Sequence, residues 1–139
     1  MEYHDANLQA AWRRVHGDSP MPEILGSLRG WECFHDSRRV GHCSANVATG
    51  EILGLEVDHD YRRRGVGRQL LSLAVDRLRA AGARRIWLAT PGDSTQPAYR
   101  FYVALGWHCS GERLANGDEI LEPPISDGGC RSTASRRTI

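Results

Sequence analysis

Residues 55–68 decide the fold, and they read Leu-Glu-Val-Asp-His-Asp-Tyr-Arg-Arg-Arg-Gly-Val-Gly-Arg. The pattern predicts a strand that ends at Val57, a polar turn, and a helix that begins at Gly65-Val66-Gly67. The first turn of a helix presents N–H groups without intrahelical partners at the positive end of the helix dipole. Glycine lets an anion approach that backbone closely, and neighbouring arginines neutralise phosphate oxygens. The stretch therefore predicts a binding site for a diphosphate or a similar anion.

The sequence on either side predicts further helices and strands from the spacing of apolar residues and the positions of turn residues. Ser94 or Thr95 is the expected N-cap of the last helix, and Gly82 is expected to end the long one. A turn at Asn116-Gly117 is expected between the last two strands. The order of elements predicts an α/β domain with a mixed, mainly antiparallel sheet and helices on its faces. Helices are expected at 8–15, 22–28, 65–81 and 97–105, and strands at 31–35, 40–47, 51–57, 85–89, 107–110 and 119–122.

Length and composition suit one soluble domain. The chain has 139 residues, of which 40% are hydrophobic and 25% are charged, enough to bury a core. Pro123-Pro124 ends the pattern, and residues 125–139, rich in Ser, Thr, Gly and Arg, are expected to form a flexible tail. No apolar run approaches the roughly 20 residues of a membrane helix. The first residues lack a basic region followed by an apolar stretch, which favours a cytoplasmic location.

The basic residues and the cysteines exclude several chemistries. All 18 basic residues are arginine, so there is no phosphate-loop lysine, pyridoxal Schiff base or lysine nucleophile. The four cysteines form no Cys-x-x-Cys pair, and four reduced thiols without a metal are expected. Neighbours on a strand point to opposite faces, so neither His42-Cys43 nor His108-Cys109 is expected to share a metal ion.

Two motifs resemble those of one enzyme family. Arg62-x-x-Gly65-x-Gly67 resembles the acyl-CoA pyrophosphate motif of the GNAT superfamily of N-acetyltransferases, [Gln/Arg]-x-x-Gly-x-[Gly/Ala]. Residues 98–107, Ala-Tyr-Arg-Phe-Tyr-Val-Ala-Leu-Gly-Trp, resemble its second signature, Ala-x-x-[Phe/Leu]-Tyr-x-x-x-Gly-[Phe/Trp]. The motifs occur in the family's order, with a helix and a strand expected between them. The resemblance covers residues 31–122 and is most specific over 55–107.

The resemblance implies an acetyl-CoA-dependent N-acetyltransferase, in which a primary amine attacks the thioester directly without a metal. It implies a single domain over residues 1–124, with 1–30 as a helical region on the acceptor side and 31–122 as the core. The sheet of the family splays between its central strands. The opening strand of the family is expected to be short or missing here, because only seven residues precede the first helix. Dimers are common in the family, so a homodimer is one expected state.

The resemblance also implies roles for individual residues. Tyr102 matches the tyrosine that protonates the departing CoA thiolate, although without the resemblance a core aromatic beside Phe101 would be the favoured interpretation. Thr95 stands where the family often has a cofactor-binding asparagine. Main-chain groups of the splayed strand would bind the pantetheine arm, and those of the glycine turn the pyrophosphate. The residues implied to bind acetyl-CoA are Leu55, Val57, Arg62, Arg63, Arg64, Gly65, Val66, Gly67, Arg68 and Thr95.

The general base and the acceptor amine stay open. Glu56 is the best-placed carboxylate, with an exposed or ion-paired strand residue as the equal alternative, while His59 in the arginine-rich turn more readily faces solvent or phosphate. Thr90 stands where many relatives that acetylate protein termini carry a glutamate. The acceptor is therefore open among polyamines, amino acids, antibiotics and protein termini. Trp31 and Trp107 are expected in the core.

Three other classes compete with this interpretation. An acyl-CoA-binding regulatory module would bind CoA without turnover, and intact Tyr102 speaks against it. A nucleic-acid-binding domain would use residues 62–64 and Arg136-Arg137, but the net charge is only +1 and no aromatics interleave with the arginines. A dinucleotide-dependent oxidoreductase lacks an opening βαβ unit and the third glycine of its motif. No nucleic-acid or membrane partner is expected.

Overall fold

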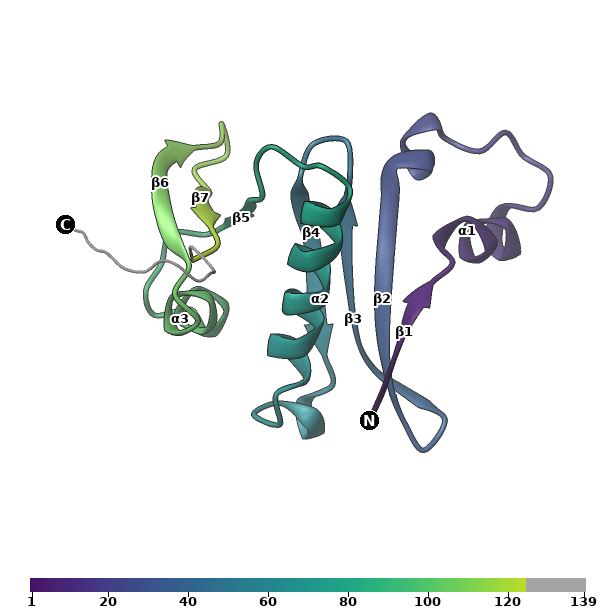
Figure 1. Ribbon diagram of the computed structural model, residues 1–139, viewed down its shortest axis with the longest axis horizontal. Helices are drawn as coiled ribbons and strands as arrows, with labels where there is room; N and C mark the ends of the chain where they lie inside the picture. The colour runs from purple at the N-terminus through teal and green to yellow at the C-terminus, as the bar shows by residue number, and fades with distance from the viewer. Residues whose placement is uncertain (125–139) are drawn as a thin grey trace. The chain divides into compact units, whose positions relative to one another are not determined.

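The computed structural model describes residues 1–124 in two compact units, Met1–Leu88 and a second that begins at Ala89 (Figure 1). The tail predicted at 125–139 lies outside the described residues. The single domain predicted over 1–124 stays a prediction. The first unit contains β1 (Glu2–Ala6), α1 (Leu8–His16), the 3-10 helix η1 (Glu23–Ser27), β2 (Leu28–His35), β3 (Arg38–Asn46), β4 (Glu51–Val57), the 3-10 helix η2 (His59–Tyr61) and α2 (Val66–Ala80). β5 (Leu88–Thr90) begins at the boundary, and α3 (Pro97–Ala104), β6 (His108–Arg113) and β7 (Glu119–Glu122) follow.

The first unit is built on an antiparallel sheet of four strands in the order β1-β2-β3-β4. The opening strand is present with five residues, so it is short rather than missing. It fits before the helix because the side chain of Asn7 accepts a hydrogen bond from the Ala10 N–H at 2.9 Å and caps α1 at once. The helix predicted at 22–28 forms only as the 3-10 helix η1.

The hairpin expected from the strands at 31–35 and 40–47 forms between β2 and β3, with a turn of two residues instead of the four left between the predicted strands. Asp36 and Ser37 both adopt left-handed backbone angles, with φ of 52° and 67°. A two-residue turn of this kind matches the twist of the flanking strands, although glycine or asparagine usually fills it. As a result β3 begins at Arg38, two residues before the predicted start.

Helix α2 covers one face of this sheet and contacts β2, β3 and β4 (Figure 1). A Cβ atom on Gly41 would lie 3.0 Å from Cγ1 of Val66 and 3.2 Å from the carbonyl oxygen of Glu56. The start of α2 therefore sits closely against the centre of the sheet. Each fully buried leucine in this layer contributes about 1.5–3 kcal/mol. The buried residues of α2 are Val66, Gly67, Leu70, Leu71, Ala74, Val75 and Leu78, and those of β2 and β3 include Trp31, Cys33, Cys43 and Ala45.

The end of α2 confirms the predicted glycine stop. Gly82 has a φ of 87°, its N–H donates to the carbonyl of Arg79, and the Ala83 N–H donates to the carbonyl of Leu78, each at 3.0 Å. These bonds form a Schellman motif. The strand predicted at 85–89 is wrong at its start, because a single parallel bridge between Glu51 and Trp87 precedes β5.

The close approach of Gly50 to the chain before β5 explains that bridge. Gly50 has a φ of 79°, and a Cβ atom there would lie 1.7 Å from the carbonyl oxygen of Arg85. The Trp87 N–H then donates to the carbonyl of Gly50 at 3.1 Å, and the Ile52 N–H to the carbonyl of Trp87 at 2.8 Å. The chain thus meets β4 at one point, where only glycine fits.

The second unit combines α3 with a three-stranded sheet in the order β5-β7-β6. The turn predicted at Asn116-Gly117 joins β6 and β7, and β6 extends three residues beyond its predicted end. The predicted N-cap of α3 is wrong: Gln96 occupies the position and makes no side-chain cap. Thr95 instead binds Asp93, whose carboxylate accepts from its N–H at 2.9 Å and its hydroxyl at 2.6 Å.

The two sheets and their helices confirm the predicted α/β class with mainly antiparallel strands. Trp31 and Trp107 are buried, as expected. Cys33, Cys43 and Cys109 are free thiols, while Cys130 lies outside the described residues. Within residues 1–124, no helix combines the length and the apolar character needed to cross a bilayer.

Candidate active site

Beyond its first residues, β4 has main-chain N–H and carbonyl groups that point away from β3, along the outer edge of the strand. In the register with β3, Glu56 lies opposite His42, and the Asp58 N–H donates to the carbonyl of Val40 at 2.8 Å. Because hydrogen-bonding directions alternate along a strand, the main-chain groups of Leu55 and Val57 point away from β3. β4 is the last strand of the sheet within residues 1–88, so this edge is open in the first unit.

A β-bulge sets which residues reach that edge. Ser44 pairs with Gly54, but the next residue of β3, Ala45, pairs with Ile52, so Leu53 is the extra residue in β4. A bulge inserts one residue, bends its strand and shifts which side the following residues face. The Ile52 N–H binds Trp87 on the outer edge, and beyond the bulge Leu55 and Val57 take that side.

The turn after β4 folds back onto the strand. Nε of Arg62 donates a hydrogen bond to the carbonyl oxygen of Val57 at 3.2 Å. Arg63 has a φ of 65°, a left-handed conformation that costs a residue with a side chain about 1–2 kcal/mol. Gly65 follows with a φ of 84°, where glycine has no such cost. The turn therefore accepts conformational strain to bring the helix start next to the end of β4.

The first turn of α2 has the properties of an anion site. Gly65 is the N-cap without a capping side chain, and the first helical bond runs from the Gln69 N–H to its carbonyl at 3.0 Å. The N–H groups of Val66, Gly67 and Arg68 therefore lack intrahelical partners. The guanidinium-bearing residues around them are all exposed, namely Arg62, Arg63, Arg64 and Arg68. The structure thus gathers the predicted phosphate-binding residues on one turn of the first unit.

Two residues that the sequence did not single out hold Arg64. Its guanidinium carbon lies 5.0 Å from the centre of the Tyr61 ring, and the Tyr61 hydroxyl lies 2.8 Å from Nδ1 of His35. A cation over an aromatic ring at an exposed site contributes about 0.5–1 kcal/mol. His35 ends β2, far from Arg64 in the sequence, so only the folded hairpin reveals this contact.

Glu56 is paired with a histidine. Oε1 of Glu56 lies 2.7 Å from Nε2 of His42 on the neighbouring strand. The Glu56 side chain is 77% exposed and that of His42 35%. The ion-paired strand residue considered as an alternative is therefore what the structure contains, while the catalytic role of Glu56 stays a prediction. In the sequence, His42 stands out only as a neighbour of buried Cys43.

Tyr102 and Thr95 belong to the second unit. Tyr102 is half-buried on α3, and its ring centre lies 5.4 Å from that of Phe101 and 6.1 Å from that of Trp107. Its carbonyl accepts from the Trp107 N–H at 3.1 Å. Thr95 lies in the turn before α3, and its hydrogen bonds lower the pKa of the Asp93 carboxyl. Thr95 therefore shapes a loop, and its cofactor contact stays a prediction.

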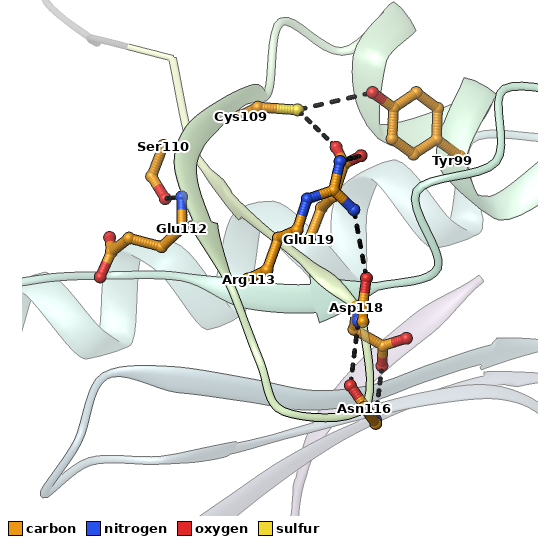
Figure 2. Close-up of polar contacts among 9 residues, drawn as sticks. Tyr99, Cys109, Ser110, Glu112, Arg113, Asn116, Asp118 and Glu119 are labelled. Carbon is orange, nitrogen blue, oxygen red and sulfur yellow. Dashed lines mark hydrogen bonds and ion pairs between the residues drawn. The ribbon is translucent and has the colours of Figure 1, made fainter.

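Tyr99, the other tyrosine of α3, belongs to a polar cluster in the second unit (Figure 2). Cys109 donates its thiol hydrogen to Oε1 of Glu119 at 2.9 Å and lies 3.5 Å from the Tyr99 hydroxyl. Arg113 binds the second oxygen of Glu119 at 3.1 Å. The bond to Glu119 raises the pKa of Cys109, and the bond to Cys109 raises the pKa of Tyr99 to about 12. Cys109 is thus kept as a thiol, a poor nucleophile.

The described residues 1–124 contain no group of three histidine, cysteine, aspartate or glutamate side chains placed to hold a metal ion. The strongest ligand-binding feature in this range is the helix start, where three N–H groups lack intrahelical partners and the surrounding arginines are exposed. They suit a phosphate-bearing ligand rather than a metal.

Comparison with known proteins gives relatives in one family. The mycothiol acetyltransferase of Corynebacterium diphtheriae is 39% identical over 75 residues, which cover 54% of this chain and 24% of the relative. The [ribosomal protein bS18]-alanine N-acetyltransferase of Salmonella typhimurium is 32% identical over 75 residues, covering 52% of this chain and 50% of the relative. The chain therefore spans a half or less of the length of these curated relatives.

Solved structures share the fold. An aminoglycoside 6'-acetyltransferase type Ii has a TM-score of 0.66 at 22% identity, with 92% of this chain and 99% of that chain covered. The PaiA N-acetyltransferase of Thermoplasma acidophilum, in complex with coenzyme A, has a TM-score of 0.64 at 15% identity, covering 90% and 100%. A model of the acetyltransferase (GNAT) family matches residues 3–107, well over half of the sequence. The chain therefore belongs to the acetyltransferase (GNAT) family.

Proposed function

We propose that the protein transfers an acetyl group from acetyl-CoA to a primary amine. The observation that carries the proposal is the helix start at Gly65, where three N–H groups lack intrahelical partners and exposed arginines lie in the same stretch, next to the end of β4. Both curated relatives are named as acetyltransferases, and the PaiA structure contains coenzyme A. Acetyl-CoA carries both a pyrophosphate and an extended pantetheine arm, which suit these two features.

The cofactor-binding residues divide between the strand and the turn. Main-chain groups of Leu55 and Val57 are proposed to bind the pantetheine arm as an added strand would, since such hydrogen bonds need no particular side chain. The N–H groups of the helix start are proposed to bind the pyrophosphate, because charge-assisted bonds from helix N-termini favour such anions. Thr95 is proposed as a further cofactor contact. Arg62, Arg63, Arg64 and Arg68 would neutralise the phosphate charge.

The reaction proposed is a direct transfer. The acceptor ammonium loses a proton, and the neutral amine attacks the thioester carbonyl, so that a C–N bond forms and the C–S bond breaks. Holding both reactants in place supplies much of the rate enhancement. Tyr102 is proposed to protonate the CoA thiolate as it leaves. Glu56 is proposed to take part in the base catalysis that removes a proton from the ammonium. One proton is released in each turnover.

The proposal also covers the extent of the domain, the location of the protein, its oligomeric state and the class of its acceptor. Residues 1–124 are proposed to act as one acetyltransferase domain, with 1–30 on the acceptor side. A cytoplasmic location and a homodimer stay predictions. The acceptor is a primary amine of unassigned identity, because the names of the relatives point to different acceptors.

A thiol-release screen tests the proposal. Acetyl-CoA is incubated with the protein and four probe amines: spermidine, kanamycin, glucosamine and a peptide with N-terminal alanine. Release of CoA thiol with at least one amine, together with the mass of its acetylated product, is expected. Binding of acetyl-CoA without release on any of them would favour the regulatory module. Neither binding nor release would refute the proposal.

A further inference from the structure

The polar face of the first sheet carries an alternating row of histidine and glutamate. In the strand register His4 lies opposite Glu32, Glu32 opposite His42, and His42 opposite Glu56. Residues directly opposite each other on neighbouring strands point to the same face. One row therefore crosses all four strands and ends at Glu56, on the strand with the open edge.

This row faces away from α2. Asp5, which follows His4, reaches Arg77 of α2 at 3.4 Å, and a Cβ on Gly41, which precedes His42, would touch α2. Since successive residues of a strand point to opposite faces, His4 and His42 lie on the other side. α1 meets that side at Gly30, where a Cβ would lie 3.1 Å from Leu8. The contact is apolar, and the side chains at the two ends of the row, His4 and Glu56, are 54% and 77% exposed.

The charged groups around His42 leave it with one partner. Glu56 of β4 binds its Nε2 at 2.7 Å. On the other side Glu32 of β2 is held by Arg39 at 3.1 Å. At the end of the row, His4 pairs with Glu2 at 3.2 Å. No hydrogen bond from Nδ1 of His42 is found within residues 1–124. A histidine that donates one ring N–H to a carboxylate keeps the other nitrogen as a base.

We propose that His42 is the base that deprotonates the acceptor ammonium, and that Glu56 orients its ring. The proposal rests on the proposed acetyl transfer. It gives the proton transfer to His42 and the orientation of its ring to Glu56. Glu56 lies between Leu55 and Val57, whose main-chain groups form the open edge. The base would therefore stand beside the strand along which the thioester is proposed to bind. Its substrate is a cationic primary amine.

The protons balance in this scheme. Nδ1 of His42 takes one proton from the ammonium, which becomes the neutral amine, and the imidazolium is stabilised by the Glu56 carboxylate. The amine forms the C–N bond, the C–S bond breaks, and the thiolate takes a proton from the acid. The nitrogen of the acceptor then loses its second proton. Water carries this proton to the deprotonated acid and restores it. His42 then returns its proton to solvent, so that one proton leaves per turnover.

Reference acidities favour the imidazole over the carboxylate. An imidazole ordinarily titrates near pH 6.5 and a glutamate carboxyl near 4.3, a difference of about two units or roughly a hundredfold in proton affinity. A base is most effective when it titrates near the working pH. The pair thus follows a common division, in which the carboxylate holds the ring and the ring moves the proton.

Variants at the two positions test the assignment with the most reactive amine of the screen. His42→Ala is expected to lower kcat/KM for that amine by about 100-fold, the lower end of the range for a general base. Added imidazole should restore several-fold of it, and acetyl-CoA affinity should stay within twofold. Glu56→Gln should lose less, about tenfold, because the amide oxygen can still accept a hydrogen bond from the ring but carries no negative charge beside the imidazolium. His108→Ala, which removes a histidine 4.0 Å from Glu122, is the control and should behave as wild type.

A greater loss in Glu56→Gln than in His42→Ala, or no rescue by imidazole, would make Glu56 the base and overturn the proposal. If wild type acetylates none of the amines, the proposed function fails by itself. The role of His42 is then decided by ¹⁵N NMR of its ring in the free protein. In the neutral ring, the spectrum should show a proton on Nε2 and none on Nδ1. A neutral ring with its proton on Nδ1 would contradict the proposal.

Discussion

Arg62 is bound to the end of the strand that precedes it: its Nε donates to the carbonyl oxygen of Val57 at 3.2 Å. This bond closes the turn between β4 and α2 and joins the open strand edge to the helix start. A single arginine thereby connects the two features proposed to bind acetyl-CoA.

Replacement of Arg62 tests that connection. Arg62→Ala should weaken acetyl-CoA binding about tenfold, because it removes a charge-assisted contact worth about 1.5 kcal/mol or more. Isothermal titration calorimetry measures the change. Arg79→Ala, an exposed arginine in the last turn of α2, is the matched control and should bind like wild type. Equal affinities for the two variants would remove Arg62 from the cofactor site.

Gly50 is predicted to be irreplaceable for stability. Its φ of 79° and the 1.7 Å separation that an added Cβ would have from the Arg85 carbonyl oxygen leave no space for a side chain. Gly50→Ala should destabilise the fold by about 1–3 kcal/mol from backbone strain alone, and by more through the clash. Urea denaturation measures it. Gly26→Ala has no atom within 4 Å of the added Cβ and should cost little. A wild-type unfolding midpoint for Gly50→Ala would contradict the bridge at Trp87.

The two tyrosines of α3 are predicted to differ in function. Tyr102→Phe should lower turnover about 100-fold, the lower range for a general acid, with little change in acetyl-CoA affinity. Steady-state kinetics of thiol release give the value. Tyr99→Phe alters the same helix, but its hydroxyl contacts Cys109 and should not be needed for turnover. Full activity in Tyr102→Phe would exclude Tyr102 as the acid.

The reactivity of Cys109 should depend on Glu119. The hydrogen bond with the Glu119 carboxylate raises the pKa of the thiol, so at pH 8 less thiolate is present than for an ordinary cysteine. Glu119→Gln removes the negative charge and should lower that pKa, which speeds alkylation by iodoacetamide a few-fold. Peptide mass spectrometry follows each cysteine, with buried Cys33 and Cys43 as internal references. An unchanged rate would mean that Glu119 does not control the thiol.

Local patterns were sufficient to predict several elements. The apolar spacing of Leu70, Leu71, Ala74 and Leu78 predicts α2, since one helical face must be buried, and Gly82 predicts its end. The glycines at 65 and 67 predict the helix start, because the conformational freedom of glycine does not depend on partners distant in the sequence. The same holds for the Asn116-Gly117 turn.

Contacts that depend on strand register could not be predicted. The pairing of His42 with Glu56 requires the alignment of β3 with β4 and the extra residue at Leu53. The turn between β2 and β3 falls within the predicted gap at 36–39, but its two-residue form was not predicted, because Asp36-Ser37 lacks the glycine that marks most such turns. The capping of α3 failed for a similar reason, because Asp93 competes for the groups of Thr95. Each outcome is decided by partners distant in sequence or by competing local bonds.

Calorimetric titration of the protein with acetyl-CoA tests the central assignment, an acetyl-CoA site at the helix start, most directly. A saturable signal with one site per chain and a dissociation constant of about 1–100 μM, near −8 to −5.5 kcal/mol, is predicted. The affinity should fall as salt concentration rises, because arginines at the helix start meet phosphates. The absence of a binding signal at millimolar acetyl-CoA would contradict the assignment and leave the helix start at Gly65 to another anion.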